Sequence, residues 1–107
     1  MDESRFNQLA DDMLARIEEA LGASDADFDY ELKAGGVIEI EFADGGKIII
    51  NRHTAAREIW IAARSGGFHF KPEADQWVNS RDGSPLVREL ERCMSEQAGE
   101  AISLGKV

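Results

Sequence analysis

The sequence predicts a single α+β domain over residues 1–107. We expect a two-layer α/β sandwich, with two helices packed on one face of a mostly antiparallel five- to six-stranded sheet. Apolar residues recur at helical spacing near both ends of the chain, whereas the middle alternates apolar and polar residues between glycine pairs. A chain of 107 residues has the size of one domain with its own core. Two amphipathic helices and a sheet with one apolar face pack most simply as two layers.

The first helix is expected over residues 4–21. Apolar side chains recur there on one face at about 100° per residue, and Gly22 comes next as a suitable stop. Acidic faces of helices are usually just solvated, so the carboxylates on the opposite face matter only together with the acidic segment after the helix. These carboxylates are Asp11, Asp12, Glu18 and Glu19.

Residues 25–32 alternate strictly between acidic and apolar side chains, which predicts a strand. Phe28, Tyr30 and Leu32 are expected to turn towards the core. The carboxylates of the other side then follow one another at about 7 Å, twice the rise per residue. The helix end and the strand start therefore bring two acidic rows together at one edge of the sheet.

Glycine turns divide the middle of the chain into hairpins, with clear signals at Gly35-Gly36 and Gly45-Gly46. Ile59 and Ile61 are expected to face inward, so Trp60 faces outward, on the sheet face left towards solvent. The strands predicted after the first one cover residues 37–43, 47–51, 58–63, 68–71 and 76–78.

A second helix is expected to begin near residue 85, with Ser84 as its cap and Pro85 at its first position. Cys93 falls within its apolar stripe, which favours a buried structural thiol. Gly99 is expected to end the helix. The tail beyond it offers Ile102 and Leu104 to cover a remaining groove.

Charge is distributed unevenly along the chain. Residues 1–31 hold ten acids and two arginines, a net charge of −8 out of −9, and the other residues hold eleven acids and ten bases. This balance argues against nucleic acid and favours cations or a basic protein surface. No apolar run approaches the roughly 20 residues of a membrane span, and no secretory signal is present, so we expect a cytoplasmic protein. The single cysteine suits a reducing compartment.

Motifs for catalysis or for a defined metal site are poorly supported. His53 and His69 stand alone, outside any ligand-spaced motif. Counted as an EF-hand loop from Asp25, the chain places Tyr30 at the required glycine and Gly36 at the required bidentate glutamate. We therefore reject an EF-hand.

What remains is an all-oxygen surface that we call the acidic ridge. Carboxylates suit Mg, Ca, Mn and oxygen-preferring iron states, and without imidazole or thiol ligands binding should be weak, multi-site and poorly selective. The ridge can also dock on a basic protein surface. Its candidate metal ligands are Asp11, Glu18, Glu19, Asp25, Asp27, Asp29 and Glu31.

Trp60 is the second unusual feature. An exposed tryptophan on a sheet face is a typical binding anchor. The alternative is that neighbours such as Arg52 or Arg57 partly cover it.

Four stretches carry a resemblance to a known family: FNQLADDMLARIEEAL, GGVIEIEFADGGKIIINRH, REIWIAARSGGFHF and DQWVNSRDGSPLVRELE. Together they resemble the frataxin family, in particular its bacterial, CyaY-like branch, over essentially the whole chain. The resemblance implies two helices on an antiparallel sheet and a role in iron–sulfur cluster assembly. It also implies weak Fe²⁺ and Fe³⁺ binding by carboxylates of the first helix and first strand.

The resemblance further implies docking on a cysteine desulfurase and its iron–sulfur scaffold protein. Glu18, Glu19, Asn51 and Trp60 match the residues expected to bind these partners. Residues 22–24 depart from the pattern, because Gly-Ala-Ser stands where relatives commonly carry more acids.

Two functions stay open. One is an iron-binding regulator of cluster assembly, and the other is a purely protein-docking inhibitor of the desulfurase with incidental binding of divalent metals. A ferroxidase or other enzyme is not expected, because oxidation at a defined centre needs a histidine or a tight carboxylate pair in a cavity. We expect a monomer that iron can assemble into oligomers. Whether the protein is an iron donor, an iron sensor or an inhibitor is left open.

Overall fold

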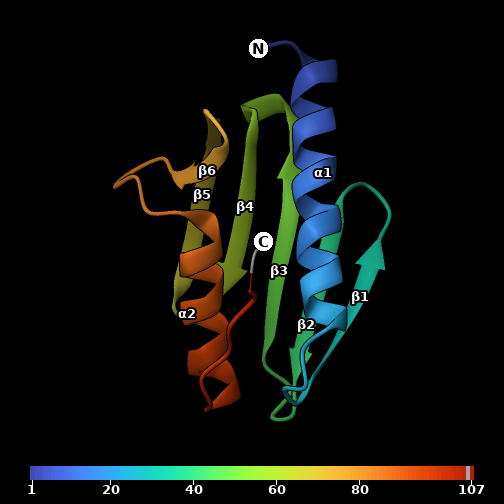
Figure 1. The fold of residues 1–107 in the computed structure, drawn as a ribbon, viewed down its shortest axis with the longest axis vertical. Helices are drawn as coiled ribbons and strands as arrows, with labels where there is room; N and C mark the ends of the chain where they lie inside the picture. Colours follow the sequence, from blue (N-terminus) through green and yellow to red (C-terminus); the bar gives the residue numbers. More distant parts are fainter. Residues whose placement is uncertain (106) are drawn as a thin grey trace.

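The computed structural model describes residues 1–105 and 107 and shows two helices packed on one face of a six-stranded sheet (Figure 1). The strands form an antiparallel meander in chain order. This confirms the predicted fold class. The elements are α1 (Glu3–Gly22), β1 (Phe28–Lys33), β2 (Val37–Phe42), β3 (Lys47–His53), the 3₁₀ turn η1 (Thr54–Ala56), β4 (Glu58–Ala63), β5 (Gly66–Glu73), β6 (Gln76–Asn79) and α2 (Leu86–Ala98).

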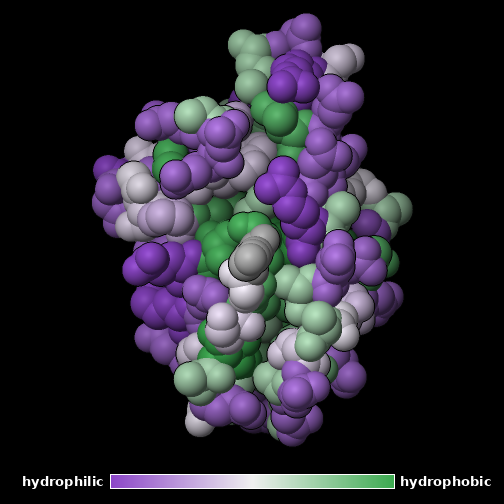
Figure 2. Space-filling view, viewed as in Figure 1, coloured by the Kyte–Doolittle hydropathy of each residue, from purple (hydrophilic) through white to green (hydrophobic). Residues whose placement is uncertain are grey.

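The core lies between the helices and the sheet. Apolar residues of the central strands alternate inward as predicted, and the tail after α2 buries Ile102 and Leu104, which are 7% and 4% exposed. Apolar residues gather in the groove between the two helices (Figure 2), where the ribbon of the tail runs (Figure 1). The predicted role of the tail is thus confirmed. No helix in the described part of the chain is long and apolar enough to cross a membrane.

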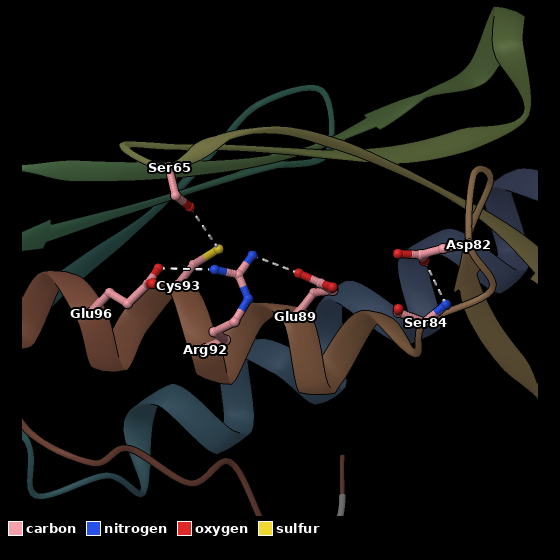
Figure 3. A network of polar contacts seen from close by, with 7 residues as sticks. All are labelled: Ser65, Asp82, Ser84, Glu89, Arg92, Cys93 and Glu96. Atoms are coloured by element: carbon pink, nitrogen blue, oxygen red, sulfur yellow. Dashed lines mark hydrogen bonds and ion pairs between the residues drawn. The ribbon is translucent and has the colours of Figure 1, made fainter.

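The start of α2 differs from the prediction by one residue. Pro85 is the N-cap with an extended backbone and Leu86 is the first helical residue, so Ser84 is not the cap. The cause is pairing with β6: the Ser84 carbonyl accepts a hydrogen bond from Asn79 N at 2.7 Å, and Pro85 forms a bridge with Val78. The Ser84 N–H donates to Asp82 Oδ1 at 2.9 Å (Figure 3).

Cys93 is a buried thiol, as predicted. It is 1% exposed, and its Sγ lies 3.7 Å from Ser65 Oγ (Figure 3). Burial raises the pKa of the Cys93 thiol above its usual value. Because the neutral form is favoured, this cysteine has the properties of a core residue and not of a nucleophile or metal ligand.

The first strand starts later than predicted. Asp25 and Asp27 precede β1, which begins at Phe28. A local turn holds them there, because Ser24 Oγ accepts a hydrogen bond from Ala26 N at 3.2 Å and the Ala26 carbonyl accepts one from Phe28 N at 3.1 Å. Serine competes with the strand ladder in this way, and the alternating pattern alone does not reveal it.

Tyr30 and Leu32 were predicted to enter the core, but they do not. Their partners across the ladder are the buried Ile40 and Ile38, so they point to the helix-covered side of the sheet. They nevertheless stay 36% and 52% exposed. β1 is the edge strand and α1 lies over β2 and β3 (Figure 1), so only Phe28 of this row packs against the core.

Candidate metal- and partner-binding surface

The helical part of the acidic ridge lies on the side of α1 that faces solvent. Glu19 is exposed and Glu18 is half-buried. Asp11 already has a partner, because its Oδ1 lies 2.5 Å from Arg52 Nη1 of β3. A cation that binds Asp11 must therefore compete with this arginine.

The strand part of the ridge points to the other face of the sheet. Asp29 pairs with Glu41 of β2, and Glu31 pairs with Glu39, and directly opposed residues share a face. Tyr30 between them points to the helix side. The ridge therefore wraps around the β1 edge: its helical carboxylates lie on one side of the sheet and its strand carboxylates on the open side.

Glu39 is neutralised by two lysines. Its oxygens lie 2.5 Å from Lys33 Nζ and 2.8 Å from Lys47 Nζ. Hydrogen bonds from Lys33 and Lys47 lower the pKa of the Glu39 carboxyl to about 2. Among the described residues, Asp29, Glu31 and Glu41 make no such ion pair, so their negative charge faces solvent.

Within residues 1–105 and 107, no group of three or more carboxylates, imidazoles or thiols is arranged to hold a metal ion. The carboxylates are instead spread along an edge, one or two at a time. Such an arrangement is not a closed metal site.

Trp60 lies on the open face, as predicted, but it is half-buried and not exposed. Its ring stacks between two imidazoles: His53 at 3.8 Å between ring centroids with 11° between planes, and His69 at 4.3 Å with 8°. Arg52 points to the helix side and bonds Asp11, so it does not cover this ring. Asn51 is the neighbour of Trp60 across β3 and β4.

Glu58 fixes the edge of the stacked indole. Its Oε1 accepts the Trp60 Nε1–H at 2.9 Å, and its Oε2 accepts the Ser80 hydroxyl at 2.7 Å. His69 Nδ1 lies 3.6 Å from the same carboxylate. Partial burial acts to raise the pKa of Glu58, but the hydrogen bonds from Ser80 and Trp60 outweigh it and lower the pKa below its usual value.

Known proteins share both the sequence pattern and the fold of this chain. The model of the frataxin-like domain matches residues 1–100. This protein belongs to the frataxin family. This frataxin is 58% identical over 104 residues to the iron-sulfur cluster assembly protein CyaY of Dechloromonas aromatica (strain RCB), covering 97% of this chain and 99% of the relative. It is 44% identical over 108 residues to the protein of the same name from Cupriavidus necator, covering 98% and 97%.

Solved frataxin structures share the fold. Frataxin from Psychromonas ingrahamii superposes with a TM-score of 0.90 at 30% identity, covering 99% of this chain and all of that one. Trimeric frataxin from the yeast Saccharomyces cerevisiae, complexed with ferrous iron, superposes with a TM-score of 0.66 at 26% identity, covering 94% and 88%.

Two residues at the open face of this frataxin were not predicted from the sequence. His53 and His69 were interpreted as isolated, yet both stack on Trp60. The signal lies in strand register: His69 is directly opposite Trp60, and His53 faces Glu58, two residues before Trp60 on β4. Register depends on turn geometry, which the glycine signals predict only approximately.

Proposed function

We propose that this frataxin is a cytoplasmic, non-enzymatic regulator of iron–sulfur cluster assembly. It binds Fe²⁺ and Fe³⁺ weakly at surface carboxylates and docks on a complex of a cysteine desulfurase and its scaffold protein. The proposal is supported by 58% and 44% identity, over nearly the whole chain, to proteins named for cluster assembly. The observation that carries it is the presence of two surfaces: a solvent-facing carboxylate edge at α1, β1 and β2, and an aromatic platform of His53, Trp60 and His69 on the open sheet face.

The carboxylate edge suits both iron and a basic partner. Asp29, Glu31 and Glu41 lie on adjacent strands, face solvent and are free of ion pairs among the described residues. A ferrous complex is known for the yeast relative named above, which supports iron as the physiological cation. Charges at such an edge also speed the encounter with a positively charged surface.

The aromatic platform suits a partner that buries apolar area. The Trp60 ring is held at both faces and at its N–H, so little side-chain freedom is lost when a partner covers it. Asn51 beside it offers a polar contact at the rim.

The metal assignment is tested by NMR titration with paramagnetic Fe²⁺ or Mn²⁺. Line broadening should concentrate on residues 11–31 and on residues 39–41 of β2, which lie opposite Asp29 and Glu31, and it should spare α2. Broadening centred on His53, His69 or Cys93 would contradict the assignment to carboxylates.

The docking assignment is tested by pull-down with the desulfurase–scaffold complex. The double variant Glu18→Lys, Glu19→Lys should weaken binding in a strongly salt-dependent way. Its matched control reverses Glu73 and Asp75 in the β5–β6 hairpin, which changes the charge by the same four units at the far edge of the sheet. Equal loss in both variants would mean that net charge matters and the location does not.

A second function is favoured by one observation, the lack of a three-ligand group among the described residues. In that case the protein is a docking inhibitor of the desulfurase, and metal binding is incidental. The two functions differ in a direct way: an inhibitor acts equally with and without iron, whereas an iron-dependent regulator does not.

A further inference from the structure

The two edges of the sheet are not equivalent. The β6 edge is closed by the segment leading to α2, through the Asn79–Ser84 hydrogen bond and the Val78–Pro85 bridge. The β1 edge has no neighbour on its outer side among the described residues, and β1 pairs regularly with β2 over all six residues. β1 is the outermost strand of the ribbon (Figure 1). It therefore presents a straight row of unpaired main-chain groups that can accept another strand.

The side chains of β1 give this edge two different faces. On the helix side, Tyr30 and Leu32 are the exposed apolar residues of the strand. On the open side, Asp29 and Glu31 form an exposed acidic row, backed by Glu41. A strand that adds here meets apolar side chains on one face and carboxylates on the other.

A second copy of the chain does not fit this pattern. In an antiparallel β1–β1 pair that continues the sheet, opposed residues share a face. Of the two registers that pair more than three residues, one sets Asp29 opposite Glu31 twice. The other sets Glu31 opposite itself and Asp29 opposite Lys33, whose charge is already paired with Glu39. Each copy also carries a net charge of −9. The edge therefore repels its own copies, in the manner of charged protective edges, but attracts a basic segment.

We propose that the outer edge of β1 receives an extended basic segment of a partner protein, which adds to the sheet as a further strand. Lysine or arginine side chains at alternate positions face Asp29 and Glu31, and apolar side chains between them pack on Tyr30 and Leu32. This inference rests on the proposed docking of the acidic ridge on a basic partner, and it adds how the partner's main chain is held. It does not depend on iron or on the Trp60 platform.

The experiment uses the full chain and synthetic peptides of ten residues that alternate lysine with valine or threonine. Amide hydrogen exchange of β1 is followed by NMR. Alternate amides of residues 28–33 point away from β2 and should exchange fast in the free protein. At 90% occupancy by the peptide, exchange at these amides should slow by about tenfold, because only the free fraction still exchanges.

Two control peptides separate strand addition from charge attraction. One has the same composition in scrambled order. The other keeps the sequence but carries N-methyl groups on amides of both of its edges, so that neither edge can pair with β1. Tighter binding of the alternating peptide, with protection of alternate β1 amides, supports the inference. Equal binding of all three peptides without protection overturns the inference. It is also overturned if none of the three peptides binds.

A protein variant gives an independent readout. Asp29→Lys with Glu31→Lys reverses the acidic row of an exposed edge, and a thermal melt verifies that the fold is kept. This variant should lose the β1 protection by the basic peptide. Failure of the edge inference is distinguishable from failure of the docking function, because the pull-down with Glu18→Lys, Glu19→Lys concerns charges on α1 and needs no strand addition.

Discussion

At the scale of single residues, Trp60 shows how this frataxin fixes a half-buried aromatic ring on the open face of its sheet. Imidazoles of His53 and His69 cover both ring faces, and Glu58 accepts the indole N–H. Stacked aromatic pairs contribute about 0.5–1.5 kcal/mol each beyond the area they bury. The side chain is therefore partly a structural residue and partly a contact surface.

Trp60→Ala should accordingly lower the free energy of unfolding by about 1–3 kcal/mol, since it removes two stacked pairs. The matched control is Trp77→Ala, which truncates a buried ring in edge-on contact with Phe6 and should cost about 3–5 kcal/mol. Urea unfolding measures both variants. If Trp60→Ala costs as much as Trp77→Ala, the open face is not the outside of the fold.

Glu39 gives the fold a dependence on acid. Its pKa in the folded protein is lowered from 4.5 to about 2 by hydrogen bonds from Lys33 and Lys47. A lowered folded pKa means that its contribution to stability is complete above about pH 4.5 and is lost as pH falls towards 2. Glu39→Gln should therefore flatten the fall of melting temperature over this range. Glu41→Gln, which breaks no ion pair among the described residues, should leave that fall unchanged.

The sequence predicted the direction of a side chain well where strand alternation alone determines it. Ile59 and Ile61 point inward and Trp60 points outward because successive side chains of any strand alternate. The stack of His53 and His69 on Trp60 needs three strands in one register, which no single stretch of sequence contains. The ion pair between Asp11 and Arg52, 41 positions apart, depends on packing in the same way.

At the scale of elements, the irregular segment after α2 covers the part of the core that lies between the two helices. Ile102 and Leu104 fill the groove between the helices, Ile102 N donates to Ser95 Oγ at 2.9 Å, and Leu104 N donates to Glu91 Oε2 at 2.7 Å. The tail is thus fixed by both apolar burial and main-chain hydrogen bonds. It is part of the core, although it has no regular secondary structure.

Leu104→Ala should lower the free energy of unfolding by about 2–5 kcal/mol, because it leaves a cavity between the helices. The same substitution at Leu32, which is 52% exposed on the β1 edge, should change it by about 0.5 kcal/mol or less. Chemical unfolding of the two variants compares one change of side chain in two environments. Similar losses at both positions would contradict the burial described for the tail.

Element boundaries were predictable only where a backbone signal dominates. Gly99 ends α2 with a left-handed conformation at φ 72°, as its lack of a side chain favours. Ser84 and Pro85 have equally strong local signals, yet pairing with β6 holds Pro85 in an extended conformation and moves the helix start to Leu86. Tertiary pairing overrides local preference at that end.

At the scale of the whole molecule, a net charge of −9 on 107 residues opposes folding by self-repulsion. Salt screens this repulsion, and a divalent cation that binds the folded carboxylates adds stability by linkage. Both 150 mM NaCl and millimolar Ca²⁺ or Mg²⁺ should raise the melting temperature, and the divalent ions should do so by more than their ionic strength explains. A melting temperature indifferent to these ions would show that the carboxylates are too dispersed to bind them.

The most direct test of the account is the rate of cluster assembly by purified desulfurase and scaffold protein, measured across iron concentrations. The wild-type chain should change this rate in a way that depends on iron. Glu18→Lys with Glu19→Lys should lose the effect, and the control with Glu73→Lys and Asp75→Lys should keep it. If the wild-type chain leaves the rate unchanged at every iron concentration, or if the Glu18, Glu19 variant acts as the wild type does, the acidic ridge is not the working surface of this frataxin.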